Sequence, residues 1–126
     1  MSSETTEPSL APVERDRPIR QDVLADLAAG RYERAIDSCR RQLHASDDLF
    51  YRHGLGLALY KRGRFEEALE VFQAEAAGSG RTQLALATVL RDLGRLAEAE
   101  AAATRAIELE PGNWAAWLLR ARLHSF

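Results

Sequence analysis

Gly63-Arg64-Phe65-Glu66-Glu67-Ala68 is the stretch that decides the fold, because two close copies of it occur elsewhere in the chain. The copies are Gly30-Arg31-Tyr32-Glu33-Arg34-Ala35 and Gly94-Arg95-Leu96-Ala97-Glu98-Ala99, and successive glycines are 33 and 31 residues apart. A period in this range is typical of stacked supersecondary units, each too thin to bury its own apolar face. The spacing therefore predicts a repeat architecture.

Each copy marks the joint between two predicted helices. Apolar residues recur at helical spacing before the second glycine and again after it, as Leu55-Gly56-x2-Leu59 and Ala68-x3-Phe72. Gly63 ends the first helix of this pair because glycine adopts a left-handed conformation without a Cβ clash. Gly56 and Ala68 are interpreted as small residues at a close helix crossing. Extended along the chain, the pattern predicts seven helices, over residues 19–29, 32–45, 49–62, 65–77, 81–93, 96–109 and 113–124.

This pattern resembles the tetratricopeptide repeat, a helix–turn–helix unit of about 34 residues with the signature W-x2-L-G-x2-Y…A-x3-F…P. The second unit matches through the stretches just quoted, and the third through Leu86-Ala87-x2-Leu90, Ala99-x3-Ala103 and Pro111. The first unit matches in its second helix, at Ala35-x3-Cys39. The resemblance covers residues 18–126. It implies an all-α, right-handed superhelical array of about seven helices, in which the first helix of each pair lines the concave side and residues 113–126 form a capping helix.

The composition agrees with an all-α fold. Of the 126 residues, 22 are Ala and 18 are Leu, against seven Val and Ile together, which disfavours a β-sandwich or barrel. The single cysteine, Cys39, excludes an internal disulfide framework. No apolar run approaches the ~18 residues of a membrane span. The first eight residues are neither basic nor apolar, so we expect no secretory signal and a cytoplasmic protein.

The charge balance argues against nucleic acid as a partner. The chain has 17 basic and 19 acidic residues and a formal net charge of −2, whereas nucleic-acid-binding proteins usually carry a basic face. Lys61 is the only lysine among the basic residues; the other 16 are arginines. We interpret these arginines as solvated helix formers, and phosphate recognition is the weaker alternative.

Residues 1–17 differ from the rest of the chain. They are rich in Ser, Thr and acids and contain Pro8 and Pro12, so they are predicted to be a flexible tail ahead of a helical domain over residues 18–126. Docking of this tail on its own domain, or on a partner, is the alternative. The segment Ala77-Gly78-Ser79-Gly80 is interpreted as a shortened turn between the second and third units, with a hinge as the alternative.

The residue patterns of the common catalytic and cofactor sites are absent from the sequence. It contains no glycine-rich phosphate loop and no G-x-S-x-G elbow. His44, His53 and His124 are too far apart to share a helix face, so a zinc site is not expected. Cys39 occupies an apolar helix position and is interpreted as a buried small side chain. We therefore expect no enzyme, no cofactor and no metal ion.

The remaining candidate for function is the concave face. The residues predicted to line it are apolar, aromatic or basic apart from one threonine, with no acid among them: Arg20, Leu24, His53, Leu57, Tyr60, Leu84, Thr88, Arg91, Leu118 and Arg122. A groove of this kind suits an extended or helical segment that is both apolar and acidic. Some family members hold the C-terminal carboxylate of heat-shock chaperones with Lys and Asn residues on the inner face. In this chain the corresponding faces carry His53 and Leu57 instead.

The leading hypothesis is a non-catalytic adaptor that binds a peptide segment of another protein. The alternatives are a small secretion-type chaperone that shields an apolar client segment, and a self-assembling scaffold. For self-association the candidates are Trp114, Leu118 and Phe126, on the premise that Trp117 and Ala121 pack on the third unit. Trp114 folding back over Leu109 and Pro111, which leaves a monomer, is the competing interpretation.

Overall fold

The computed structural model describes residues 12–75 and 79–124, and side chains from residue 19 onward. These residues form seven α-helices and no strand: α1 (Pro12–Ala29), α2 (Tyr32–Ala45), α3 (Leu49–Lys61), α4 (Phe65–Ala74), α5 (Gly80–Asp92), α6 (Leu96–Leu109) and α7 (Trp114–His124). The predicted number of helices is confirmed. None of the described helices is long and apolar enough to cross a membrane.

Two helix boundaries differ from the prediction by more than one residue. α1 begins at Pro12 rather than residue 19, so residues 12–17 of the predicted tail are helical, whereas residues 1–11 lie outside the described residues. Proline suits the first turn of a helix because the N–H it lacks has no partner there. α4 ends at Ala74 instead of residue 77, and residues 76–78 lie outside the described part.

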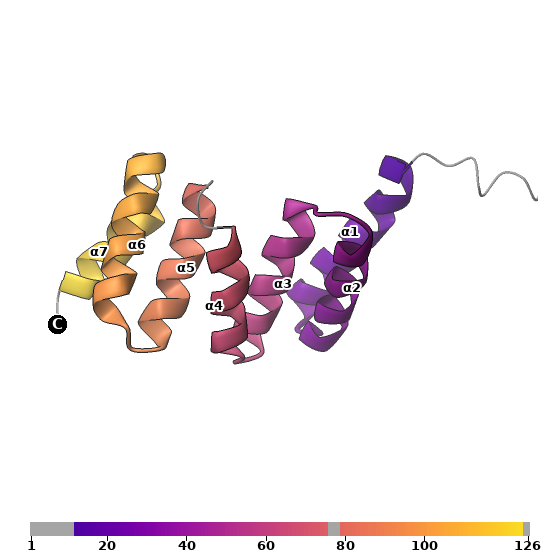
Figure 1. The fold of residues 1–126 in the computed structure, drawn as a ribbon, viewed down its shortest axis with the longest axis horizontal. Helices are drawn as coiled ribbons and strands as arrows, with labels where there is room; N and C mark the ends of the chain where they lie inside the picture. Colours follow the sequence, from indigo (N-terminus) through magenta and orange to yellow (C-terminus); the bar gives the residue numbers. More distant parts are fainter. Residues whose placement is uncertain (1–11, 76–78, 125–126) are drawn as a thin grey trace, which may run out of the picture.

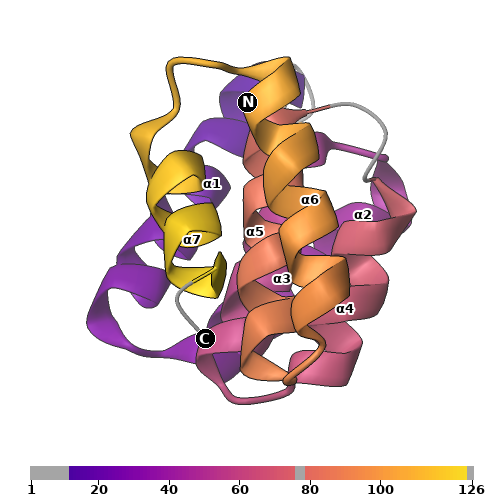
Figure 2. The same ribbon diagram turned by 90° about the vertical axis from the view of Figure 1, so that its left-hand side faces the viewer.

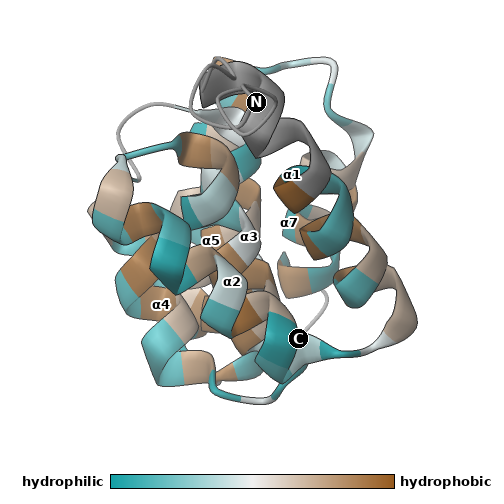
Figure 3. Cartoon of the chain, turned by 90° about the vertical axis from the view of Figure 1, so that its right-hand side faces the viewer, coloured by the Kyte–Doolittle hydropathy of each residue, from teal (hydrophilic) through white to brown (hydrophobic). Residues whose placement is uncertain are grey.

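The helices stack in chain order into two layers (Figures 1 and 2). The odd-numbered helices α1, α3, α5 and α7 form the inner layer, where α1 contacts α3, α3 contacts α5 and α5 contacts α7. α2, α4 and α6 form the outer layer. Hydrophobic and hydrophilic segments alternate along α2 and α4, as in helices that bury one face and leave the other in water (Figure 3).

The three Gly-Arg pairs make the same turn. Gly30, Gly63 and Gly94 have φ of 83°, 86° and 80°, in the left-handed region that glycine adopts without strain. The N–H groups of Arg31, Arg64 and Arg95 donate to the carbonyls of Asp26, Leu59 and Leu90 at 2.8–2.9 Å. Each glycine N–H also donates three residues back, so the turn is a Schellman motif that satisfies helix-end carbonyls. The repeated sequence therefore encodes a repeated helix-to-helix turn.

The larger of two hydrophobic clusters in the described residues has Tyr51, Phe72 and Ile36 as its largest fully buried side chains, and the smaller consists of Ala106, Ile107 and Ala116. Gly56 of α3 lies directly under Phe72 of α4, and a Cβ added there would meet the ring at 2.5 Å. Ala68 is also fully buried. The predicted close crossing of α3 and α4 is confirmed, and it requires the small residue at position 56.

Candidate functional site

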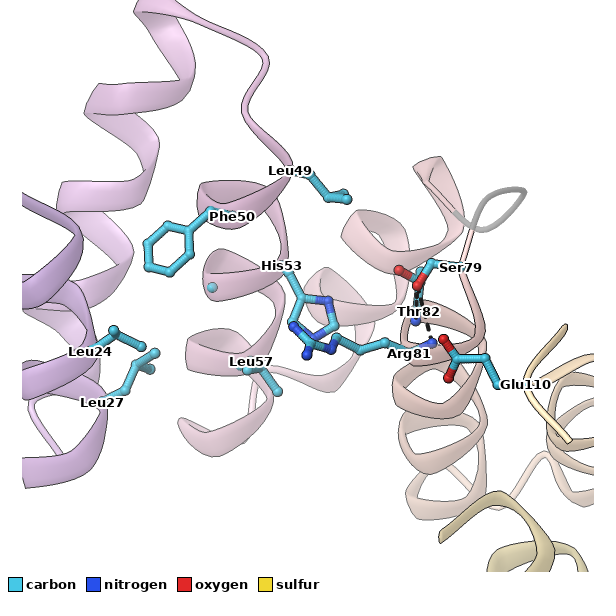
Figure 4. A pocket seen from close by; sticks show the side chains of 11 residues that line it. Leu24, Leu27, Leu49, Phe50, His53, Leu57, Ser79, Arg81, Thr82 and Glu110 are labelled. Carbon is cyan, nitrogen blue, oxygen red and sulfur yellow. Dashed lines mark hydrogen bonds between the residues drawn. The ribbon is translucent and has the colours of Figure 1, made fainter. Parts of the chain in front are cut away.

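Three adjoining cavities follow the inner layer. The first, of about 450 Å³, lies between α1, α3 and the start of α5 (Figure 4). The second, of about 230 Å³, lies between α3 and α5, and the third, of about 210 Å³, between α5 and α7. Leu24, Leu27, Phe50 and Leu57 give the first cavity its apolar walls.

The three cavities form one continuous groove because neighbouring cavities share walls. His53, Leu57 and Arg81 border both the first and the second cavity. Leu84 and Thr88 border both the second and the third. We call the three cavities together the groove; it extends from α1 to α7.

The structure places nine of the ten predicted concave-face residues around the groove. Arg20 is the exception, since it lines none of the cavities described here. Its guanidinium bonds Asp48 at 2.5 Å and lies over the Phe50 ring, 5.1 Å from the centroid. Arg20 therefore fastens α1 to the start of α3. A charge partner from 28 residues away cannot be foreseen from helical spacing.

Arg81 is the principal residue of the groove that the sequence analysis missed. Its guanidinium points at the His53 ring, where the first two cavities meet (Figure 4). Arg81 makes no side-chain hydrogen bond or ion pair with any described residue. Burial, and secondly the positive charge of Arg81, lower the pKa of His53, so the imidazole is neutral at pH 7. The middle of the groove therefore presents one unpaired cation.

The other arginines of the groove differ in their partners. Arg91 pairs with Asp92 at 3.0 Å. Arg122 at the third cavity has, like Arg81, no polar side-chain partner among the described residues. Tyr60 donates its hydroxyl to Asp92 at 2.5 Å, which ties the end of α3 to α5 while its ring lines the second cavity. Two guanidinium groups, at Arg81 and Arg122, are thus available to an acidic ligand.

The expectation of a groove without acids is wrong at Glu110, and a second acid, Glu75, lies close to the groove without lining its cavities. Glu110, which precedes α7, lines the first cavity, and a Cβ on Gly80 would lie 2.8 Å from its side chain. Glu75 lies beneath His53, 3.7 Å from the imidazole, with its side chain only 4% exposed. Thr82 donates to Glu75 at 3.2 Å, and burial raises the pKa of this carboxyl. Both acids come from loops, which the prediction from helix positions did not consider.

The turn before α5 has a structural explanation. Ser79 caps α5 by accepting hydrogen bonds from the N–H groups of Arg81 and Thr82. Gly80 is buried against the Glu110 side chain, which would have to shift to admit a larger residue. Ala77 and Gly78, the other half of the proposed hinge, lie outside the described residues.

The C-terminal helix packs differently from the prediction. Trp117 and Ala121, expected to pack on the third unit, are exposed, and Ala116, Leu119 and Leu123 pack instead. The Trp117 indole N–H donates to the Pro111 carbonyl at 2.8 Å, which holds the ring at the surface.

The proposed self-association residues are placed as follows. Trp114 is 80% exposed and Leu118 is 51% exposed, and Phe126 lies outside the described residues. Leu109, which Trp114 would have covered in the competing interpretation, is itself 51% exposed.

Two further features concern Cys39 and the side chains that could hold a metal ion. Cys39 is fully buried, and burial raises the pKa of its thiol to about 11. No group of three or more His, Cys, Asp or Glu side chains suited to a metal ion occurs in residues 19–75 and 79–124.

Two family models match the sequence, both described as tetratricopeptide repeat, one over residues 23–81 and the other over residues 80–123. The chain belongs to the tetratricopeptide repeat (TPR) family. This agrees with the helix pairs and with the three identical turns. No curated protein matches the sequence.

Solved TPR structures share the fold at low identity. The first TPR domain of human RPAP3 superposes with a TM-score of 0.80 and 20% identity, covering 85% of this chain and 87% of that one. The second TPR domain of human RPAP3, in complex with the HSP70 peptide SGPTIEEVD, gives 0.77 and 24%, covering 84% and 92%. The Yersinia enterocolitica type III secretion chaperone SycD, in complex with a peptide of the translocator YopD, gives 0.76 and 22%, covering 89% and 88%. At these identities the likeness concerns the fold.

Proposed function

We propose that this TPR protein is a cytoplasmic, non-catalytic interaction module that binds a segment of another protein in the groove. The observation that carries the proposal is the continuity of the groove, whose three cavities share walls from α1 to α7. A row of adjoining cavities with apolar and basic walls suits an extended or helical segment rather than a small compact ligand. The solved RPAP3 and SycD complexes, which hold peptides on the same fold, support this proposal.

The groove favours a ligand with apolar side chains around an acidic one. Leu24, Leu27 and Leu57 offer apolar contacts in the first cavity, and Arg81 stands at its inner boundary. An arginine fork binds a carboxylate through two parallel hydrogen bonds, and Arg81 has no competing polar partner among the described residues. Glu110 repels an acid at the edge of the first cavity, so the ligand's carboxylate belongs beside Arg81.

The groove chemistry differs from that of a carboxylate-clamp protein. The residues that line the three cavities include no lysine and no asparagine. His53, which is neutral at pH 7, cannot replace a lysine as a charge partner. We therefore propose an internal acidic-apolar segment as ligand and do not extend the HSP70 peptide to this chain.

Selection from a random peptide library tests this proposal. Peptides selected by the wild-type protein should be enriched in an acid flanked by large apolar residues. Arg81→Ala combined with Arg122→Ala should weaken binding about tenfold and flatten its dependence on salt, because two charge-assisted contacts are lost. Arg41→Ala, on the exposed face of α2, is the matched control and should bind as the wild type does.

The result that contradicts the proposal is also clear. If the selected peptides show no acidic-apolar pattern, or bind the Arg81/Arg122 variant with wild-type affinity, the groove is not the site. The outer layer would then be the next surface to test.

A chaperone for an apolar client segment is the second candidate. It is favoured by the exposed Leu24 and Leu49 at the first cavity, which are 54% and 55% exposed, and by the fold shared with SycD. A chaperone stripped of its client should aggregate when expressed alone, whereas an adaptor should stay in solution. Expression of the chain by itself separates the two roles.

A further inference from the structure

The outer face of α7 carries large apolar side chains in water. Trp114 is 80% exposed, Trp117 43% and Leu118 51%, and the exposed Ala121 lies on the same face. Their spacing of i, i+3, i+4 and i+7 forms one stripe along the helix, which we call the α7 stripe. At about 100° per residue, the buried residues Ala116, Leu119 and Leu123 lie on the opposite side. Helices that are apolar on two opposite sides are typically covered by neighbouring elements on both sides.

One polar group of the α7 stripe, the indole N–H of Trp117, can be buried without losing its hydrogen bond. The Trp117 indole N–H already donates to the Pro111 carbonyl at 2.8 Å. The Arg120 guanidinium lies over the same ring, 5.0 Å from its centroid. Covering the Trp117 ring therefore leaves its indole N–H paired, so the cost of burying an unpaired donor is absent at this residue.

We propose that a second copy of this chain covers the α7 stripe, as an antiparallel helix pair about a two-fold axis. The register supports this arrangement, because the midpoint of Trp114 and Ala121 coincides with the midpoint of Trp117 and Leu118. An antiparallel pair centred there places Trp114 opposite Ala121 of the second copy, and Trp117 opposite Leu118 of the second copy. Each large ring faces a smaller side chain, as self-complementary packing requires.

Charge supports the same orientation. The basic groups of α7, at Arg120, Arg122 and His124, all lie in its last five residues, and α7 contains no acid. A parallel pair would bring the two basic ends together, and it would also set Trp114 against Trp114. The antiparallel pair separates the basic ends and directs each toward Glu110, which precedes α7 in the second copy.

The interface is small, so the dimer is weak. Two indole rings and a leucine at these exposures offer on the order of 400 Å² per copy, which is the size of a transient contact. We therefore expect dimerisation in the micromolar range. Dimerisation through the α7 stripe does not depend on the function proposed for the groove. Because Leu118 also borders the third cavity, the test variants leave it intact.

Sedimentation equilibrium over a concentration series tests the inference. The wild-type mass should rise from the 14.0 kDa monomer toward twice that value. Trp114→Ala should weaken the dimer about tenfold by removing the ring. Ala121→Trp should weaken it similarly by setting two rings against each other. The double variant Trp114→Ala/Ala121→Trp exchanges large and small sides and should restore dimerisation to within about threefold of the wild type.

Leu49→Ala is the matched control, because Leu49 is 55% exposed but lies at the groove. It should dimerise as the wild type does, and all variants should keep the wild-type helical spectrum and melting temperature. A wild-type mass of 14.0 kDa at every concentration overturns the proposal. So does a dimer that is as strong in Trp114→Ala as in the wild type, or one that is weakened in Leu49→Ala. Failure of the double variant to recover overturns the antiparallel register.

Discussion

α3 and α7 both belong to the inner layer, yet their apolar residues differ in burial. α3 buries Tyr51, Gly54, Leu55, Gly56, Ala58 and Leu59, since α2 and α4 pack against it. α7 buries only Ala116, Leu119 and Leu123 and contacts only α5 and α6 among the described helices. Both helices are apolar on more than one side. The difference shows that neighbouring elements, and not the helix's own pattern, decide which apolar side is buried.

Truncation of two aromatic rings should give the largest contrast between these regions. Phe72, which covers α3, is fully buried, so Phe72→Ala should lower the free energy of unfolding by about 4 kcal/mol through lost burial and a cavity. Trp114 on α7 is 80% exposed, so Trp114→Ala should change it by less than about 0.5 kcal/mol. Urea denaturation of dilute protein measures both. Equal losses would show that Trp114 packs within one chain.

Two glycine substitutions should give the next contrast. Gly56→Ala places a Cβ 2.5 Å from the buried Phe72 ring, and the resulting overpacking should cost about 2 kcal/mol. Gly112→Ala, just before α7, meets nothing within 4 Å and should stay within about 0.5 kcal/mol of the wild type. Thermal unfolding of the two variants checks this. A tolerated alanine at position 56 would mean that α3 and α4 cross less closely than described.

The sequence predicts the fold well because its decisive features are local. The left-handed Gly30, Gly63 and Gly94, each followed by arginine, set the helix–helix turns within a few residues. The small Gly56 identifies a close helix crossing in the same direct way.

The groove is predicted less completely, because several of its features come from distant residues. Glu110 reaches the first cavity from the loop before α7, and Asp48 takes Arg20 away from the groove. Helical periodicity carries no information on such pairs. The orientation of α7 was also mispredicted, since its two apolar sides give two equally good registers and only packing against α5 and α6 selects Leu119 and Leu123.

A smaller effect is expected at His53, which α3 presents to the groove. Burial and the charge of Arg81 lower the pKa of His53 in the folded protein. As the pH falls, His53 therefore takes up a proton in the unfolded chain before it does so in the folded one. As the pH falls from the ordinary histidine pKa to the lowered pKa of His53, the contribution of His53 to the free energy of unfolding therefore decreases. Glu75 acts in the opposite direction, because burial raises its pKa and its protonation favours the folded state.

Arg81→Gln should raise the pKa of His53 by removing the nearby positive charge. The imidazole resonances in an NMR titration measure the change. Arg91→Gln is the control, because Arg91 is paired with Asp92 and lies at the third cavity. An unchanged His53 pKa in Arg81→Gln would place the guanidinium away from the ring.

NMR mapping of a selected peptide on the isotope-labelled wild-type protein tests the central claim most directly. If the groove is the binding site, amide and methyl shifts change along α1, α3 and α5, most strongly around Leu57, Arg81 and Leu84, while α2 and α6 stay as in the free protein. Shifts confined to α2, α4 and α6, with those three residues unchanged, would contradict the account and move the binding site to the outer layer.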